Sequence, residues 1–286
     1  MSLLHASPTA GYVTTLRCLV FGMWAAKFAV DPLQELAGLP QSAYWPPTPL
    51  SWLSRETDLL MVSYGALLAL RLAGIASALA CLSSGLLRSA APICCLLATI
   101  DQATLRGFGH VNHAEILLLL ASYVFCLSAW TSQKGQHPEP LLITLLMLVT
   151  YMLTGIHRVA VGGLEVFASD SIVFWSIENA SRISAFNFGG GAWLGDHPVF
   201  WLPMKVSFAA ITLIEILGPL ALLSMPFRRF YLVAMAGFHI GVALTMNIIF
   251  WENAVLLVFL LGGDLIPRGE APLGIGGSMN EAGRAV

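Results

Sequence analysis

Long apolar runs separated by short polar segments dominate the pattern of this sequence. A helix needs about 20 predominantly apolar residues to cross a bilayer, and several runs approach that length. We expect membrane helices near 13–30, 59–82, 90–105, 114–130, 141–161, 205–225, 229–250 and 254–266. The third and last runs are short, so they are candidates for tilted or re-entrant segments, or for helices packed inside the bundle. The pattern predicts an all-α, polytopic transmembrane helical bundle of about eight spans.

The connections and the chain ends complete the predicted organisation. Residues 1–12 form an N-terminal segment, and 13–266 form the membrane domain. Segment 31–58 is rich in proline and aromatic residues, a composition that suits the headgroup level of a bilayer. The longest connection, 162–204, is expected to face outward and to pack against the bundle, because the Lys and Arg distribution weakly favours cytoplasmic termini. Residues 267–286 are glycine-rich and are expected to be a disordered tail.

The composition supports a membrane protein and argues against a nucleic-acid partner. Hydrophobic residues fill 57% of the 286 positions and charged residues only 10%, whereas soluble domains carry about 25% charged residues. The formal net charge is −2, and no basic surface for a phosphate backbone is evident. The expected partner is therefore the lipid bilayer.

Charged and polar residues inside the expected spans are the main indication of function. A charged side chain at the centre of a span costs on the order of 2.5–3.5 kcal/mol, so each one needs a partner or a wet cavity. The residues concerned are Arg71, Asp101, His157, Arg158, Glu215 and His239. We infer that they serve a shared polar site inside the bundle. Tyr151, Thr154 and Arg158 share one face of a helix, and Pro219, one turn after Glu215, is expected to kink its helix.

A pair of histidines opens the fourth expected span and suggests a metal site as an alternative. His110 and His113 have the H-x-x-H spacing that presents two imidazoles to one metal, and His157 or His239 would complete the ligand set. A histidine inside a membrane is more often a hydrogen-bonded packing residue. Structural ion pairs that fix helix orientation are likewise the alternative for Arg71, Arg158 and Glu215.

A series of short motifs follows a recognisable order between residues 12 and 266. They are Arg17 in the first span, Tyr44-Trp45-Pro46-Pro47, Asn112-His113, Tyr151-Met152-Leu153-Thr154-Gly155-Ile156-His157-Arg158, Glu215-Ile216-Leu217-Gly218-Pro219-Leu220, and Phe238-His239 followed by Phe250. In this order they resemble the HTTM membrane domain that is shared with vitamin K-dependent gamma-carboxylase and its bacterial relatives. The resemblance implies a multi-pass enzyme of the bacterial inner membrane.

The resemblance also implies a type of chemistry. In the carboxylase, a lysine activates a reduced quinone, and oxygen converts the quinone to a strong base that removes a proton from a glutamate side chain, which then takes up carbon dioxide. The lysine pair expected after Gly155-Ile156 is here His157-Arg158. Arginine is essentially never deprotonated, whereas imidazole exchanges protons near neutral pH. The resemblance therefore favours another proton-abstraction or oxygen-linked redox reaction over carboxylation itself.

These considerations give each candidate residue a predicted role. His157 is the candidate general base, and Arg158 is expected to stabilise negative charge on a substrate oxygen. His113 and His239 are further proton-transfer or cofactor-orienting groups, and Glu215 balances the charge of Arg158 or of another buried cation. The candidate cofactor contacts are Arg71, Tyr151 and Asn112. We expect a small lipophilic or peptide substrate and, as cofactor, a reduced quinone.

Two other classes of function fit the same residues. A non-catalytic membrane carrier or channel would use Arg71, Glu215 and His239 to line a path for a solute. A membrane protein with a histidine-ligated metal or haem would use His110 and His113 as ligands. The sequence shows no P-loop, dinucleotide fingerprint, G-x-S-x-G or H-E-x-x-H motif that would favour a soluble-enzyme mechanism.

Overall fold

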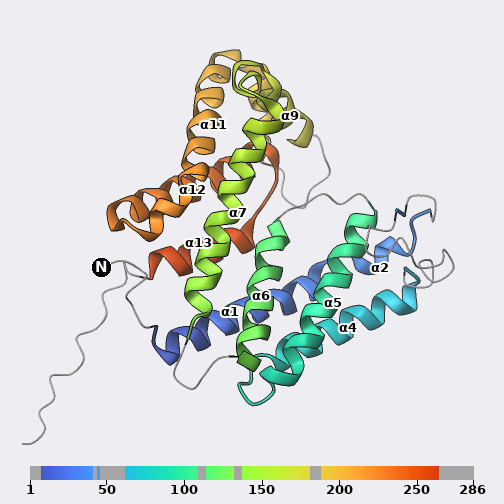
Figure 1. The fold of residues 1–286 in the computed structure, drawn as a ribbon. Coiled ribbons are helices and arrows are strands. Elements are labelled where there is room, and N and C mark those ends of the chain that lie inside the picture. The colour runs from blue at the N-terminus through green and yellow to red at the C-terminus, as the bar shows by residue number, and fades with distance from the viewer. Residues whose placement is uncertain are drawn as a thin grey trace, which may run out of the picture.

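A computed structural model of the chain describes residues 8–40, 44–45, 62–108, 114–131, 137–180 and 188–263. Within these ranges every regular element is a helix (Figure 1). This confirms the predicted all-α class.

The expected apolar runs correspond to helices in the structure. These helices are α1 (Ala10–Val30), α4 (Tyr64–Ala80), α5 (Leu87–Gly107), α6 (Ala114–Thr131), α7 (Glu139–Gly162), α11 (Trp201–Ile216), α12 (Met225–Met246) and α13 (Trp251–Gly262). Four helical segments are long and apolar enough to cross a bilayer, namely α1, α7, Pro198–Ile216 and α12. Helices α4 and α13 and the segment Glu115–Thr131 are apolar but shorter. The four longer segments indicate a membrane protein, and the count of eight spans stays a prediction.

The long connection expected at 162–204 contains several short helices. They are α8 (Glu165–Ala168), α9 (Ser171–Ala180), α10 (Gly190–Asp196) and the 3₁₀ helix η3 (Pro198–Phe200). Another short helix, α2 (Leu33–Leu36), follows α1. Helix α10 packs against α9 and α12, as expected from the aromatic content of this segment. The approach is close, because a Cβ atom on Gly190 would lie 2.2 Å from the carbonyl oxygen of Leu244.

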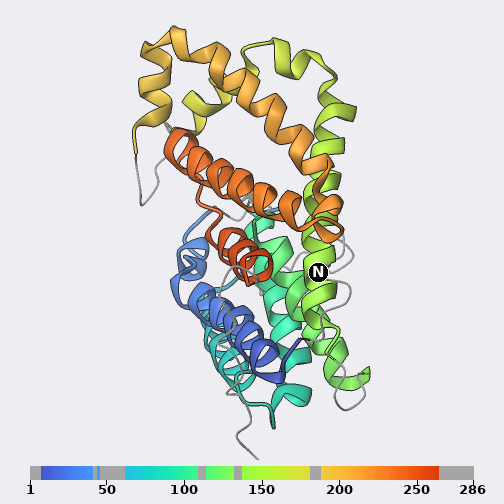
Figure 2. The same ribbon diagram turned by 90° about the vertical axis from the view of Figure 1, so that its left-hand side faces the viewer.

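The helices form two groups that α7 and α13 join. Helices α1, α4, α5 and α6 pack against one another, and α7 runs from α6 to α11 (Figure 1). Seen from the side, α13 lies between α1 and α12 (Figure 2), and it contacts α6, α7 and α12. The polar groups described below lie at the helix contacts that α1, α7 and α13 make.

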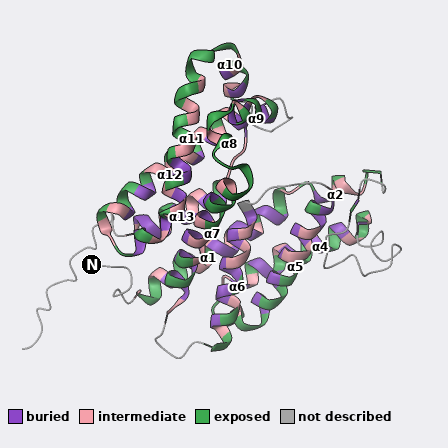
Figure 3. Ribbon diagram, turned by 45° about the horizontal axis from the view of Figure 1, so that its top comes forward, coloured by how far each residue is buried: buried purple, intermediate pink, exposed green. Residues whose placement is uncertain are grey.

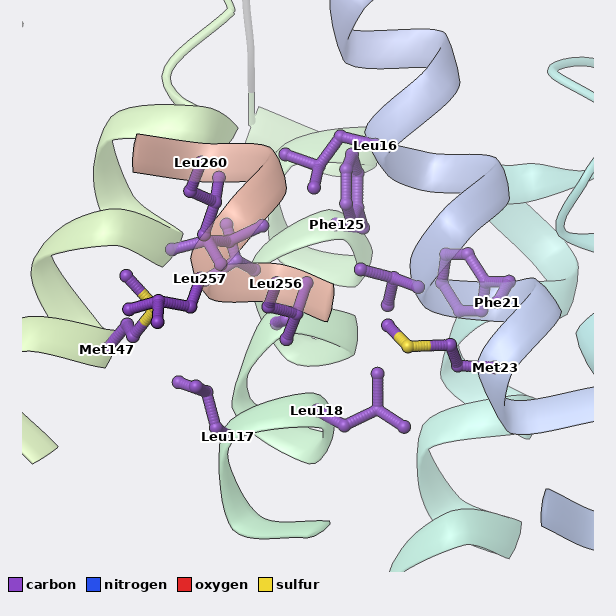
Figure 4. Packing of buried hydrophobic residues seen from close by; sticks show 14 of the residues in the cluster. Leu16, Phe21, Met23, Leu117, Leu118, Phe125, Met147, Leu256, Leu257 and Leu260 are labelled. Atoms are coloured by element: carbon purple, nitrogen blue, oxygen red, sulfur yellow. The ribbon is translucent and has the colours of Figure 1, made fainter. Parts of the chain in front are cut away.

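The main core forms where α13 meets the other helices. Buried faces point inward, and exposed faces line the outside of the bundle (Figure 3). In the close view, side chains from α1, α6, α7 and α13 interdigitate, among them Leu16, Phe21, Leu117, Leu118, Phe125, Met147, Leu256, Leu257 and Leu260 (Figure 4). Close van der Waals packing of this kind is a main contribution to helix association in a bilayer, where lipid tails are as apolar as leucine.

Pro219 has a stronger effect than the expected kink. Helix α11 ends at Ile216, and a 3₁₀ helix, η4 (Gly218–Leu222), carries the proline in its first turn. A proline inside an α-helix removes a backbone donor and clashes with the preceding turn. Helix α12 then begins at Met225, where the Ser224 side chain accepts a hydrogen bond from the backbone N–H of Phe227. The proline therefore separates α11 from α12.

Candidate functional site

The crossing of α7 and α11 brings two predicted site residues together. Gly155 lies at this crossing, where an added Cβ atom would be 2.9 Å from a side-chain carbon of Ile216 and 3.0 Å from the carbonyl oxygen of Thr212. The absence of a side chain on Gly155 lets the two helices approach closely. One turn further along α7, Arg158 therefore reaches α11.

Arg158, which is partly buried, forms an ion pair with the buried Glu215. Its Nη1 atom lies 2.5 Å from Oε2 of Glu215 and 2.6 Å from Oγ1 of Thr212, and its guanidinium group lies 4.7 Å from the centre of the Phe208 ring. The Glu215 side chain is 1% exposed. Removing either partner of such a pair leaves an uncompensated buried charge. The predicted charge balance between Arg158 and Glu215 matches this geometry.

A second pair, Tyr151 and His239, joins α7 to α12. The hydroxyl of Tyr151 and Nε2 of His239 are 2.7 Å apart, and both residues are buried. Rings of Phe238 and Phe250 flank the imidazole. The other ring nitrogen, Nδ1, is buried and has no hydrogen-bond partner among the described residues. A buried polar nitrogen without a partner costs free energy, so it marks a place where a ligand atom would be stabilised.

The two pairs lie along one face of α7. Tyr151, Gly155 and Arg158 follow one another at spacings of four and three residues, which places them on the same side of the helix. Tyr151 lies within electrostatic range of Glu215 and of Tyr231 on α12. The hydroxyl of Tyr231 is buried and is also without a hydrogen-bond partner in the described part of the chain. The pairs therefore form one polar strip between α7, α11 and α12.

An apolar cavity adjoins this strip. Its volume is about 510 Å³, and it lies between α9, α11 and α12, with Ile172, Met204, Phe208, Ile211, Phe238 and Val242 among its lining residues. Two glycines of α12, Gly237 and Gly241, also line it, and a Cβ atom on either would meet nothing within 4 Å. Phe208 packs under Arg158, and Phe238 packs beside His239. The cavity therefore touches both polar pairs through aromatic side chains.

Other predicted site residues lie elsewhere. Arg71 binds the C-terminal end of α1, donating to the carbonyl oxygens of Phe28, Ala29 and Asp31 at 2.7–2.8 Å. The last carbonyls of a helix lack partners within the helix, and a cation there also interacts favourably with the helix dipole. Arg71 thus has a structural contact that the sequence did not reveal, and it is not part of the strip.

Of the remaining candidates, His157 is the one that lies within the described part of the chain. His157 is exposed on the surface of α7, although it precedes Arg158 directly. His110, Asn112 and His113 lie outside the described residues, so their predicted roles stay predictions. Among the described residues, no group of three or more His, Cys, Asp or Glu side chains could hold a metal ion.

A buried ionic cluster also lies in the other half of the bundle. Lys27 of α1 is 7% exposed, and its Nζ atom lies 2.9 Å from Glu252 of α13, 3.3 Å from Glu115 of α6 and 3.7 Å from Asp31. Asp101 of α5 lies within electrostatic range of Lys27. We call these five residues the Lys27 cluster. The position of a lysine within an apolar span was a usable signal in the sequence, but its partners come from helices far away along the chain.

The fold and these polar contacts define a class of protein, namely an all-helical membrane protein with buried polar groups at its helix contacts. Comparisons with models of protein families, with curated proteins and with solved structures found no match to this chain. The resemblance to the HTTM domain therefore stays a prediction that rests on the motifs.

Proposed function

We propose that this chain is a membrane enzyme of the HTTM type that carries out proton-transfer or oxygen-linked redox chemistry on a small lipophilic substrate. The observation that carries the proposal is the cavity of about 510 Å³ beside the polar strip. Ligand pockets are typically apolar, with a few polar groups that fix orientation. Here the Tyr151–His239 pair and the Arg158–Glu215 pair lie behind the aromatic lining, beside Phe238 and Phe208.

In this proposal the proton-transfer role belongs to His239 rather than to His157. His239 is buried beside the cavity-lining Phe238, and its Nδ1 atom has no hydrogen-bond partner among the described residues, whereas His157 is exposed. When the Tyr151 hydroxyl donates a hydrogen bond to Nε2, Nδ1 carries the imidazole proton and can donate to a substrate oxygen. In the other tautomer, Nε2–H donates to the Tyr151 hydroxyl and Nδ1 can accept a proton from the substrate. Which tautomer forms depends on the substrate group that occupies the site.

Arg158 would stabilise negative charge that develops on the substrate. Arg158 follows Tyr151 by seven residues on α7. At about 1.5 Å per residue, the two Cα atoms are about 10 Å apart along the helix axis. A molecule in the cavity would contact Phe238, which packs beside the imidazole, and Phe208, which packs under the guanidinium. Glu215 and Thr212 hold Arg158 in place, so the charge is preorganised before any substrate binds.

A reduced quinone is the cofactor class that fits these residues best. An aromatic ring with a lipophilic chain suits the apolar lining, and its hydroxyl oxygens suit the unpartnered Nδ1 of His239. A bound quinone would supply the redox chemistry, while the chain's own residues would orient the ring and exchange protons with its oxygens. The location in a bacterial inner membrane is implied only by the family resemblance.

Native mass spectrometry of the detergent-purified protein tests this proposal. We expect a retained organic molecule in the wild type and its loss in Gly241→Leu, because the new side chain fills the cavity. Gly65→Leu is the matched control, since Gly65 is exposed on α4 and also has open space around it. Retention of the same molecule by Gly241→Leu, or no retained molecule in the wild type, would contradict the proposal.

A further inference from the structure

The Lys27 cluster is separate from the polar strip and has an unusual charge balance. Three of its carboxylates are almost completely buried, with exposed fractions of 0% for Asp101, 3% for Glu115 and 2% for Glu252. One buried ammonium group, that of Lys27, faces them. If all three carboxylates were ionised, the buried part of the cluster would carry a net charge of about −2, which a low-dielectric interior disfavours strongly.

Neighbouring charged residues do not neutralise the excess negative charge of these buried carboxylates. Asp31 adds a further carboxylate and is the most exposed member, at 17%. Arg71 of α4 is the neighbouring cation, but its guanidinium donates to backbone carbonyls at the end of α1 and to the side chain of Gln34. The described part of α6 and α13 contributes Glu115 and Glu252 to the cluster. The charge of the cluster is therefore set mainly by its own five residues.

Two carboxylate oxygens have room for a proton. Oδ1 of Asp101 and Oε2 of Glu115 are buried and lack a hydrogen-bond partner among the described residues. Asp101 comes from a fourth helix and lies within electrostatic range of Lys27, Asp31 and Glu115. Among the described residues, its other oxygen accepts a hydrogen bond from the neutral amide of Gln102, at 3.0 Å. Asp101 is thus a fourth carboxylate beside the three that pair with Lys27, and within the described ranges it has no ion pair of its own.

We propose that Lys27, Asp101, Glu115 and Glu252 form a proton-binding site that holds at least one carboxyl proton at neutral pH. Uptake forms one O–H bond on Asp101 or Glu115, with the proton taken from hydronium or a protonated buffer molecule, and release reverses this step. Asp31 is the least buried member of the cluster and lies 3.7 Å from Lys27. The ligand of this site is the proton, and the site is separate from the Tyr151–His239 pair.

Infrared spectroscopy of the purified protein in lipid tests the proposal. A protonated carboxyl group has a C=O stretching band that an ionised carboxylate lacks, and the band shifts when H₂O is replaced by D₂O. We expect this band in the wild type at neutral pH and a smaller band in Asp101→Asn or Glu115→Gln. The control is Glu165→Gln, which changes an exposed glutamate of α8 and is expected to leave the band unchanged.

Lys27→Met gives a second test that does not depend on removing a carboxyl group. Without the ammonium, the cluster loses its only cation and must hold one more proton, so we expect the band to grow. A role for Lys27 in packing alone predicts no growth. The proposal is overturned if the wild type lacks the band, if neither carboxyl variant reduces it, or if Lys27→Met leaves its area unchanged.

Discussion

Replacement of Gly155 by alanine is the most direct test of how α7 and α11 fit together. The added Cβ atom would lie 2.9 Å from Cγ1 of Ile216, 3.0 Å from the carbonyl oxygen of Thr212 and 3.2 Å from Cβ of Glu215. Ordinary contacts of this kind are 3.4–4 Å long. The Ile216 side chain can rotate, but the Thr212 carbonyl belongs to the helix backbone. The two helices must therefore move apart by several tenths of an ångström.

The cost of this movement can be separated from the helix preference of alanine. Overpacking a well-packed contact typically costs about 1–3 kcal/mol, whereas alanine is favoured over glycine in a helix by about 1 kcal/mol. Gly22→Ala, in the middle of α1, provides the same helix preference in a place where a Cβ atom meets nothing within 4 Å. We expect Gly155→Ala to be less stable than Gly22→Ala by about 1–3 kcal/mol.

Unfolding of the purified variants by denaturing detergent measures this difference. The movement also loosens the contact between Arg158 and Glu215. Because the valine side chain is larger and pushes the helices further apart, the loss of stability is expected to be larger for Gly155→Val than for Gly155→Ala. Equal stabilities of the Gly155→Ala and Gly22→Ala variants would refute the close helix approach. The position of Arg158 at Glu215 would then need another explanation.

Substitutions at three further positions test single contacts by the same unfolding measurement. Tyr151→Phe removes the hydroxyl that pairs with His239 and should cost about 1–3 kcal/mol, since Nε2 is left buried without a partner; no loss would argue against the pair. Arg71→Ala should cost about 1–3 kcal/mol through the carbonyls at the end of α1, and Arg71→Lys should restore little of it, because one ammonium cannot reproduce the guanidinium fork. Asn247 adopts a left-handed conformation with φ 54° and bonds both Phe188 and Ala180. Asn247→Ala should therefore be less stable than Asn247→Gly by about 1 kcal/mol, and an inverted order would contradict the backbone strain.

The sequence predicted the helices well because each one depends on a local property. An apolar run such as that of α1 or α7 needs no partner to be recognised, and a proline such as Pro219 ends a helix through its own ring. The 162–204 connection was harder, since α9 and α10 have only 10 and 7 residues, fewer than the window of about 11–18 residues in which helical periodicity is recognised. Their positions depend on contacts with α12, such as the approach of Gly190 to Leu244.

The sequence alone also determined that polar residues lie within the apolar helices, but only the tertiary structure decided which of them meet. Tyr151 and His239 are 88 residues apart, and Lys27 and Glu252 are 225 apart. Arg71 and His157 looked equally suited to a buried site, yet one caps α1 and the other is exposed. The physical reason is that a contact between helices depends on how each helix is rotated and where it crosses its neighbour. Those quantities are set by close packing at points such as Gly155, and no local pattern along the chain contains them.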